Sequence, residues 1–165
     1  MAAAERLGWD EASGRDLWLL APGDPATWPA AVRLPARHAI AIVAGPTHAL
    51  PDAALHALAR TLLDAGAIWL VVWGPGAERA HALFRDAVLI AERSQAEETV
   101  VMTAAEGGTL DEALLFALAE ARPSAAYTDA CDALLVVALD AAAAARARAA
   151  LAAPAEFMAR MTTGG

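Results

Sequence analysis

Three side chains near the middle of the sequence have the types and spacing of metal ligands. Glu78 and His81 are three residues apart, the spacing of one half of a paired-metal carboxylate motif on a helix. The other half is absent, but His48 could join them as the third ligand of a single metal ion. Alternatively, Glu78 is an ordinary first-turn acid and His81 lies at the edge of the helix's buried face. We predict no metal site here.

The same stretch contains a glycine-rich turn that could bind an anion. Gly74, Pro75 and Gly76 directly precede the helix, where free N–H groups favour phosphate or carboxylate, and Arg79 would add positive charge. The turn is not the G-x-G-x-x-G dinucleotide motif, because Arg79 occupies its third small position. A plain connecting turn is the alternative. Trp73, just before the turn, could stack on a ligand or pack in the core.

The composition excludes several classes of enzyme. The chain has no lysine, so it can form neither a Schiff base nor a P-loop phosphate site. None of its serines, at positions 13, 94 and 124, lies in a G-x-S-x-G elbow. Cys131 is the single cysteine, which excludes an intramolecular disulfide and a cysteine-based zinc site. We expect no cofactor, and whether the protein is an enzyme stays open.

Charge and hydropathy also limit the partners. The net charge of −8 repels nucleic acid and anionic lipid, and the arginines are too few to form a basic patch. No uncharged stretch reaches the 18 or more apolar residues that a membrane span needs. Residues 1–16 are charged and do not form a secretory signal. We therefore predict no nucleic-acid or membrane binding and a cytoplasmic location.

Alternating strand and helix patterns must position these residues. Seven apolar residues at 67–73 predict a strand buried on both faces, and further strands are expected at 17–21, 39–44, 99–103 and 133–139. Helices are expected at about 51–66, 77–92, 109–121 and 140–153, the third beginning with a Thr109/Glu112 capping box. Because a helix follows each strand from 39–44 onward, these strands should be parallel.

The pattern predicts an α/β fold, with a single three-layer domain of the Rossmann-like or flavodoxin-like type. Its mainly parallel sheet would contain about five strands, with helices on both faces. The strand at 17–21 should lie at an edge, since the prolines at 22–37 leave no room for a crossover helix. Residues 1–16 are expected to be weakly ordered, 17–153 to form the α/β domain and 154–165 to form a tail.

One stretch of the sequence resembles a known family. The pattern W-x-x-x-W-G-P-x-x-E-R-x-H, from Trp69 to His81, is similar to a bacterial family of small α/β proteins of unknown function. The similarity extends to Met102 and Thr103 and to T-L-D-E-A-L at 109–114. The resemblance implies a fold and no chemistry.

The sequence leaves two hypotheses for the function. The third helix has a complete inward stripe, yet Leu115 and Phe116 project to either side of it, which favours a homo-oligomer or protein-partner interface unless Phe157 and Met161 cover them. This non-enzymatic association is the leading hypothesis. The alternative is a small enzyme or sensor that binds a nucleotide or other anionic metabolite at the carboxyl edge of the sheet. Its candidate ligand-binding residues are His48, Trp73, Gly74, Gly76, Glu78, Arg79 and His81.

Overall fold

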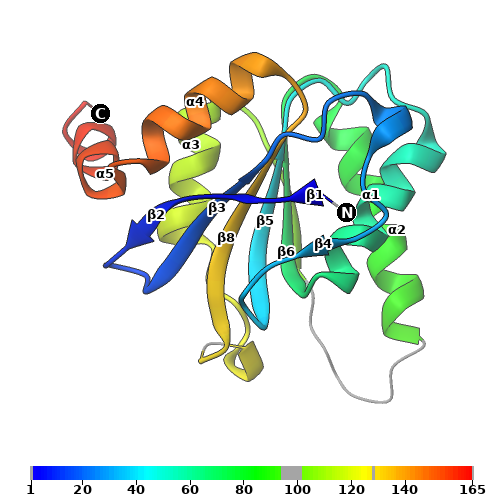
Figure 1. Cartoon of the computed structure of the whole chain (residues 1–165), viewed down its shortest axis with the longest axis horizontal. Coiled ribbons are helices and arrows are strands. Elements are labelled where there is room, and N and C mark those ends of the chain that lie inside the picture. Colours follow the sequence, from blue (N-terminus) through cyan, green and yellow to red (C-terminus); the bar gives the residue numbers. More distant parts are fainter. Residues whose placement is uncertain (1, 94–101, 128, 165) are drawn as a thin grey trace.

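The computed structural model describes residues 2–93, 102–127 and 129–164. A six-stranded sheet forms its centre, in the order β2-β3-β8-β5-β6-β7 (Figure 1). Only β2 is antiparallel to its neighbour, and the other pairs are parallel. The strands are β2 (Glu5–Asp10), β3 (Arg15–Leu20), β5 (His38–Ala44), β6 (Ala67–Trp73), β7 (Met102–Glu106) and β8 (Cys131–Ala138).

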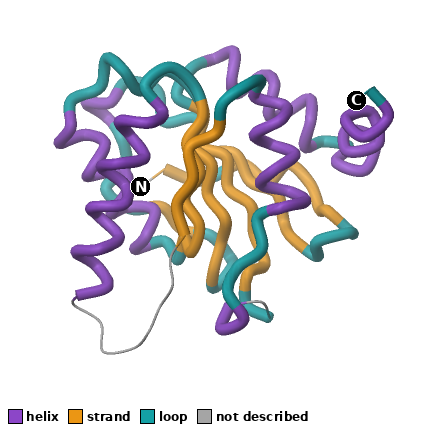
Figure 2. Tube along the Cα trace, turned by 180° about the vertical axis from the view of Figure 1, so that it is seen from behind, coloured by secondary structure: helices purple, strands orange, loops and turns teal. Residues whose placement is uncertain are grey.

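Helices cover both faces of this sheet. They are α1 (Asp52–Asp64), α2 (Ala77–Arg93), α3 (Leu110–Leu115), α4 (Ala141–Leu151) and α5 (Pro154–Thr163). One face of the sheet packs against α1 and α2, and the other packs against α3, α4 and α5. Figures 1 and 2 show these two layers from opposite sides. A short pair, β1 (Ala2–Ala3) and β4 (Val32–Arg33), forms a separate small sheet. No helix among the described residues is long and apolar enough to cross a membrane.

The apolar strands are buried on both sides, as the unbroken hydrophobic runs predict. In β8, Leu134 and Val136 join the cluster under α3 and α4, whereas Leu135 and Val137 join the cluster under α1 and α2. This alternation follows from the two-residue period of a strand. The expected parallel pairing is confirmed for β5, β6, β7 and β8. The described part of β7 begins at Met102. The predicted start of that strand, at 99–101, lies outside the described residues.

The helix ends also match their sequence signals. Thr109 accepts a hydrogen bond from the Glu112 N–H while the Glu112 carboxylate accepts one from the Thr109 N–H, which is the predicted capping box. After Leu115 the helix widens into a π turn at Phe116–Glu120. Asp140 caps α4 through the Ala143 N–H at 2.7 Å. Pro154 then begins a further helix, α5.

The amino-terminal region departs from the expectation. Residues 5–10, expected to be weakly ordered, form β2, and β2 takes the edge position predicted for the strand at 17–21. A tight turn closes the β2–β3 hairpin, with Gly14 at a φ of 68° and its N–H bonded to the Asp10 carbonyl at 2.8 Å. The prediction was wrong about the edge because a charged, antiparallel edge strand lacks the continuous apolar run of a buried one.

The last helix is part of the fold, because Phe157 is fully buried in the cluster under α3 and α4. We expect Phe157→Ala to lower the free energy of unfolding by about 3–5 kcal/mol, since it removes a buried aromatic ring and leaves a cavity. Urea denaturation followed by circular dichroism measures this change.

Met161→Ala is the matched control on the same helix. Met161 is only half-buried, so its truncation should cost about 1 kcal/mol or less. Equal losses for the two variants would contradict the docking of α5 through Phe157.

Candidate functional site

The residues predicted to bind an anion lie in loops that pack tightly on one another at the carboxyl edge of the sheet. The N–H groups of Thr47 and His48 donate to the Pro75 carbonyl, at 2.8 and 3.1 Å. A Cβ atom on Gly74 would lie 2.5 Å from the Gly45 carbonyl oxygen, and one on Gly76 would lie 2.5 Å from the His48 nitrogen. Both glycines also have positive φ angles, 115° and 88°. The close approach of the two loops, together with the positive φ angles, therefore explains why glycine occupies both positions.

Arg79 joins these loops instead of standing free. Its guanidinium donates to the carbonyl of Thr47 at 3.3 Å and to that of Leu50 at 2.8 Å, and it pairs with the Asp52 carboxylate. These contacts tie the start of α2 to the loop before α1. Since the carbonyls and Asp52 use several of its donors and offset its charge, an anion must compete with them.

The remaining predicted ligands at this edge differ in their exposure to solvent. His48 and Glu78 are exposed, and His81 is half-buried. No group of three or more His, Cys, Asp or Glu residues in the described ranges is arranged to hold a metal ion. Trp73 is half-buried and donates from Nε1 to the Gly108 carbonyl at 3.1 Å, so its ring is fixed between β6 and the start of α3.

The predicted interface residues are partly covered within the chain. Leu115 and Phe116 are half-buried against the cluster under α3 and α4, and the Phe116 ring contacts Trp69 edge to face, with centroids 5.9 Å apart. Phe157 is buried and Met161 packs on the same cluster. All four residues thus belong to or pack against one cluster, and association through the exposed remainder of Leu115 and Phe116 stays a prediction.

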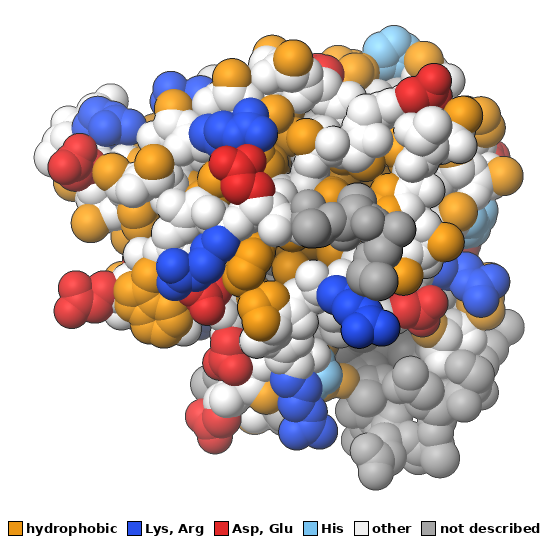
Figure 3. Space-filling model, in the orientation of Figure 1, with side chains coloured by type: hydrophobic (Ala, Val, Ile, Leu, Met, Phe, Trp, Pro, Cys, Tyr) orange, Lys and Arg blue, Asp and Glu red, His pale blue; other side chains and the backbone are white. Residues whose placement is uncertain are grey.

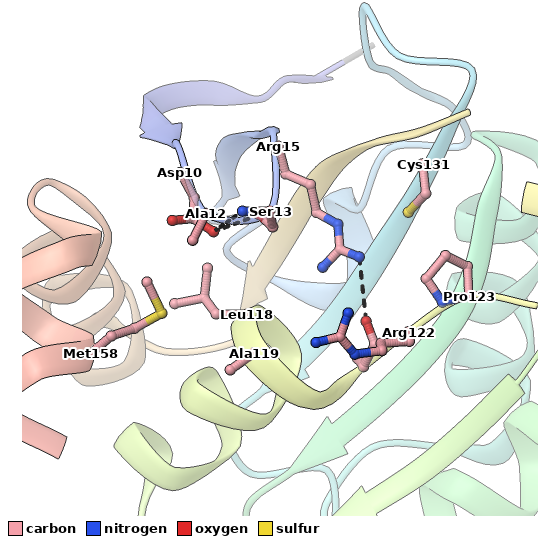
Figure 4. A pocket seen from close by; sticks show the side chains of 11 residues that line it. Asp10, Ala12, Ser13, Arg15, Leu118, Ala119, Arg122, Pro123, Cys131 and Met158 are labelled. Carbon is pink, nitrogen blue, oxygen red and sulfur yellow. Dashed lines mark hydrogen bonds between the residues drawn. The ribbon is translucent and has the colours of Figure 1, made fainter. Parts of the chain in front are cut away.

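A pocket at the opposite edge of the sheet contains a different set of charged side chains. It has a volume of about 490 Å³ and lies at the amino ends of β3 and β8, against the end of the π turn (Figure 4). We call it the Arg15 pocket. Its lining residues are Asp10, Ala12, Ser13, Arg15, Leu118, Ala119, Ala121, Arg122, Pro123, Cys131 and Met158.

Arg15 is the buried cation of this pocket. Only 7% of the residue is exposed, and one Nη donates to the Ala121 carbonyl at 3.3 Å. Its Nε has no hydrogen-bond partner among the described residues. A guanidinium has five N–H donors, and beyond its contacts with the Ala121 carbonyl and the Cys131 thiol the Nε donor of this buried group is unused by the protein. Burying a charge without an opposite charge is unfavourable, and among the described residues Arg15 has no ion-pair partner, unlike the exposed Arg6 and Arg148.

Asp10 is the buried anion on the neighbouring strand. It is 2% exposed, and its Oδ2 accepts hydrogen bonds from the Ser13 N–H at 3.1 Å and from the Ser13 hydroxyl. Figure 4 shows Asp10 and Ser13 beside Arg15, with Arg122 below it. The pocket therefore offers both a positive and a negative group.

Cys131 lines the pocket without the properties of a nucleophile. Burial raises the pKa of its thiol above the ordinary value, and the nearby charge of Arg15 only partly offsets this effect. The group is thus a protonated thiol at neutral pH, whereas thiolate is the reactive form.

A second cavity adjoins the first. It has a volume of about 600 Å³ and shares Asp10, Ala12 and Met158 with the Arg15 pocket. Trp9, which is 50% exposed, and Pro154 contribute apolar walls, and Glu11 and Glu156 are acidic. We call this cavity the Trp9 groove.

The sequence prediction missed this site because it treated residues 1–16 as weakly ordered. One signal was present: Arg15, Leu17 and Leu19 alternate with a period of two, which places all three on one face of a strand. A charged residue on a buried face is a candidate functional group. The alternation alone did not indicate Asp10, which the hairpin brings opposite Arg15.

The raised pKa of Cys131 leads to a test of its reactivity. In the native protein, we expect iodoacetamide at pH 7.5 to alkylate Cys131 at least about tenfold more slowly than in the guanidinium-unfolded chain, because both thiolate fraction and access are reduced. The rate should increase as the pH is raised, and Arg15→Met should move this increase to higher pH, since Arg15 lowers the pKa. Mass spectrometry measures the rate, and equal native and unfolded rates would contradict the assignment.

Comparison with known sequences assigns the chain to a family. Residues 17–156 match a family described as "Domain of unknown function (DUF7684)". The matched range contains Arg122 and Cys131 but begins after Arg15, so the β2–β3 turn lies outside it. No curated protein and no solved structure matches the chain significantly. Because the match covers most of the sequence, the protein belongs to this family of unknown function, in agreement with the kind of family that the sequence resembles.

Proposed function

We propose that the protein is a small-molecule-binding module that holds an anionic group, a carboxylate or a phosphate, on Arg15. The observation that carries this proposal is the burial of a guanidinium with unused donors at the wall of a cavity of about 490 Å³. Arginine binds carboxylate and phosphate with paired, charge-assisted hydrogen bonds. Cavities of about 300–1,000 Å³ suit small ligands.

The backbone around the pocket supports this role. The π turn at Phe116–Glu120 ends at Ala121, whose carbonyl orients the Arg15 guanidinium. Such turns are rare in proteins and occur frequently at functional sites. Cys131 is a protonated thiol, so its contribution to the pocket is packing and not nucleophilic attack.

At the carboxyl edge, close contacts join the loops where a ligand would be expected. We propose a Rossmann-like arrangement, since β7-β6-β5-β8 repeats the 3-2-1-4 order of that fold, in which ligands bind where the order reverses. That point lies between β5 and β8. Here the Leu139 N–H donates to the Ala44 carbonyl at 2.8 Å, and a Cβ on Gly45 would lie 2.9 Å from the Leu139 Cβ. The anionic-metabolite hypothesis is therefore better placed at Arg15 than at Gly74–Gly76.

Isothermal titration calorimetry with sodium benzoate and with inorganic phosphate tests the proposal. We expect one of the two to bind, and Arg15→Gln to weaken its binding at least about tenfold through loss of a charged hydrogen bond. Arg15→Lys should bind with intermediate affinity, because it keeps the charge but loses the planar fork.

Arg60→Gln is the matched control. Arg60 is exposed on α1 and lines another cavity, so binding should be unchanged. Circular dichroism checks that each variant is folded. Equal binding by Arg15→Gln and the wild type would overturn the assignment to Arg15.

Self-association through α3 is the second candidate, supported by the exposed remainder of Leu115 and Phe116. If this surface forms a dimer, Phe116→Glu should reduce the mass measured by light scattering to that of a monomer, because the charge cannot be buried at an apolar interface. Since Phe116 contacts Trp69, circular dichroism must accompany the measurement. A monomeric wild-type protein would exclude this candidate.

A further inference from the structure

Two buried side chains of opposite charge line the Arg15 pocket without pairing with each other. Asp10 and Arg15 are direct partners in the β2–β3 register, so their side chains lie on the same face of the hairpin. Facing residues in antiparallel strands have Cβ atoms about 4.5–5.5 Å apart, close enough for an ion pair. The described residues nevertheless form no salt bridge between Asp10 and Arg15.

Separate contacts turn the two side chains apart. Ser13 donates two hydrogen bonds to Asp10, while Arg15 donates to the Ala121 carbonyl across the pocket. Both residues are more than nine-tenths buried. The hairpin and the end of the π turn thus hold a carboxylate and a guanidinium at the same cavity, each with bonding capacity that the other does not use.

We propose that the ligand is a zwitterion of the α-amino acid class, with its carboxylate on Arg15 and its ammonium group on Asp10. The inference rests on the proposed function, since it needs an anionic group at Arg15. A simple carboxylate would satisfy Arg15 but bring a like charge towards Asp10, and a simple amine would do the reverse. A zwitterion gives each buried charge an opposite partner.

The adjoining Trp9 groove limits which ligand side chains fit. A side chain leaving the Arg15 pocket past Met158 meets the apolar walls of Trp9 and Pro154. Glu11 and Glu156 line the same groove and disfavour a further carboxylate. These walls fit an amino acid with an apolar side chain, such as phenylalanine or leucine, better than glutamate.

Calorimetry with three matched compounds on the wild-type protein tests the zwitterion. These are L-phenylalanine, 3-phenylpropionate, which lacks the ammonium group, and phenethylamine, which lacks the carboxylate. We expect L-phenylalanine to bind at least about tenfold more tightly than either analogue, because each analogue leaves one buried charge without a partner. L-Leucine should also bind, and L-glutamate should bind more weakly than both amino acids.

Variants of two of the acidic residues on the hairpin, Asp10 and Asp16, test where the ammonium group binds. Asp10→Asn keeps an acceptor for Ser13 but loses the charge, so it should abolish the preference for L-phenylalanine over 3-phenylpropionate. Asp16→Asn is the matched control, because Asp16 faces Arg6 in an exposed ion pair on the same hairpin, and it should keep the preference. Circular dichroism and the melting temperature check the fold of each variant. If Asp10→Asn does not fold, the comparison of the three compounds on the wild-type protein tests the proposal by itself.

The outcomes separate this inference from the proposed function. Binding of 3-phenylpropionate as tightly as L-phenylalanine, lost in Arg15→Gln, would overturn the zwitterion and leave an anion site. Binding of phosphate or benzoate alone would have the same meaning. Absence of binding by every one of these compounds would overturn both proposals.

Discussion

The pairing of β5 with β6 on one side and β8 on the other is the constraint on which the rest of the structure depends. Six of the seven residues in β5 are buried, and both of its edges are hydrogen bonded to parallel neighbours. Parallel neighbours require crossover segments, so this central strand dictates that α1, α2 and α3 return the chain across the sheet faces. The same pairing brings the loops after β5 and β6 together, where the Gly45 N–H donates to the Trp73 carbonyl at 3.0 Å.

The central elements could be predicted because their signals are local. Ala67 to Trp73 is an apolar run that suits only a fully covered strand, and Thr109 with Glu112 forms a cap whose partners are three residues apart. The edge strand could not be predicted in this way. Its charged residues are stabilised by distant partners, as in the ion pair of Glu5 with Arg148 at 2.9 Å, which no local pattern reveals.

The candidate site illustrates the same difference between local and distant information. Arg79 and the two glycines form a conspicuous sequence pattern, yet their contacts explain the packing of one loop on another. Asp10 and Arg15 carry no motif, and their significance arises only when the hairpin and the end of the π turn enclose a cavity. On the face shown in Figure 3, arginine and acidic side chains lie next to one another, so the surface charge does not indicate the buried Asp10 and Arg15.

The bond from Arg15 to the Ala121 carbonyl has a consequence for the motions of the hairpin. It joins residues 106 positions apart in the chain, across the boundary between the edge of the sheet and the helical layer. An edge hairpin can detach locally without global unfolding, and such openings have low free energies where few contacts must break. A molecule held by both Asp10 and Arg15 would link β2 to β3 and add contacts that must break before the hairpin opens, so occupancy of the pocket would be reported by slower amide hydrogen exchange in these two strands.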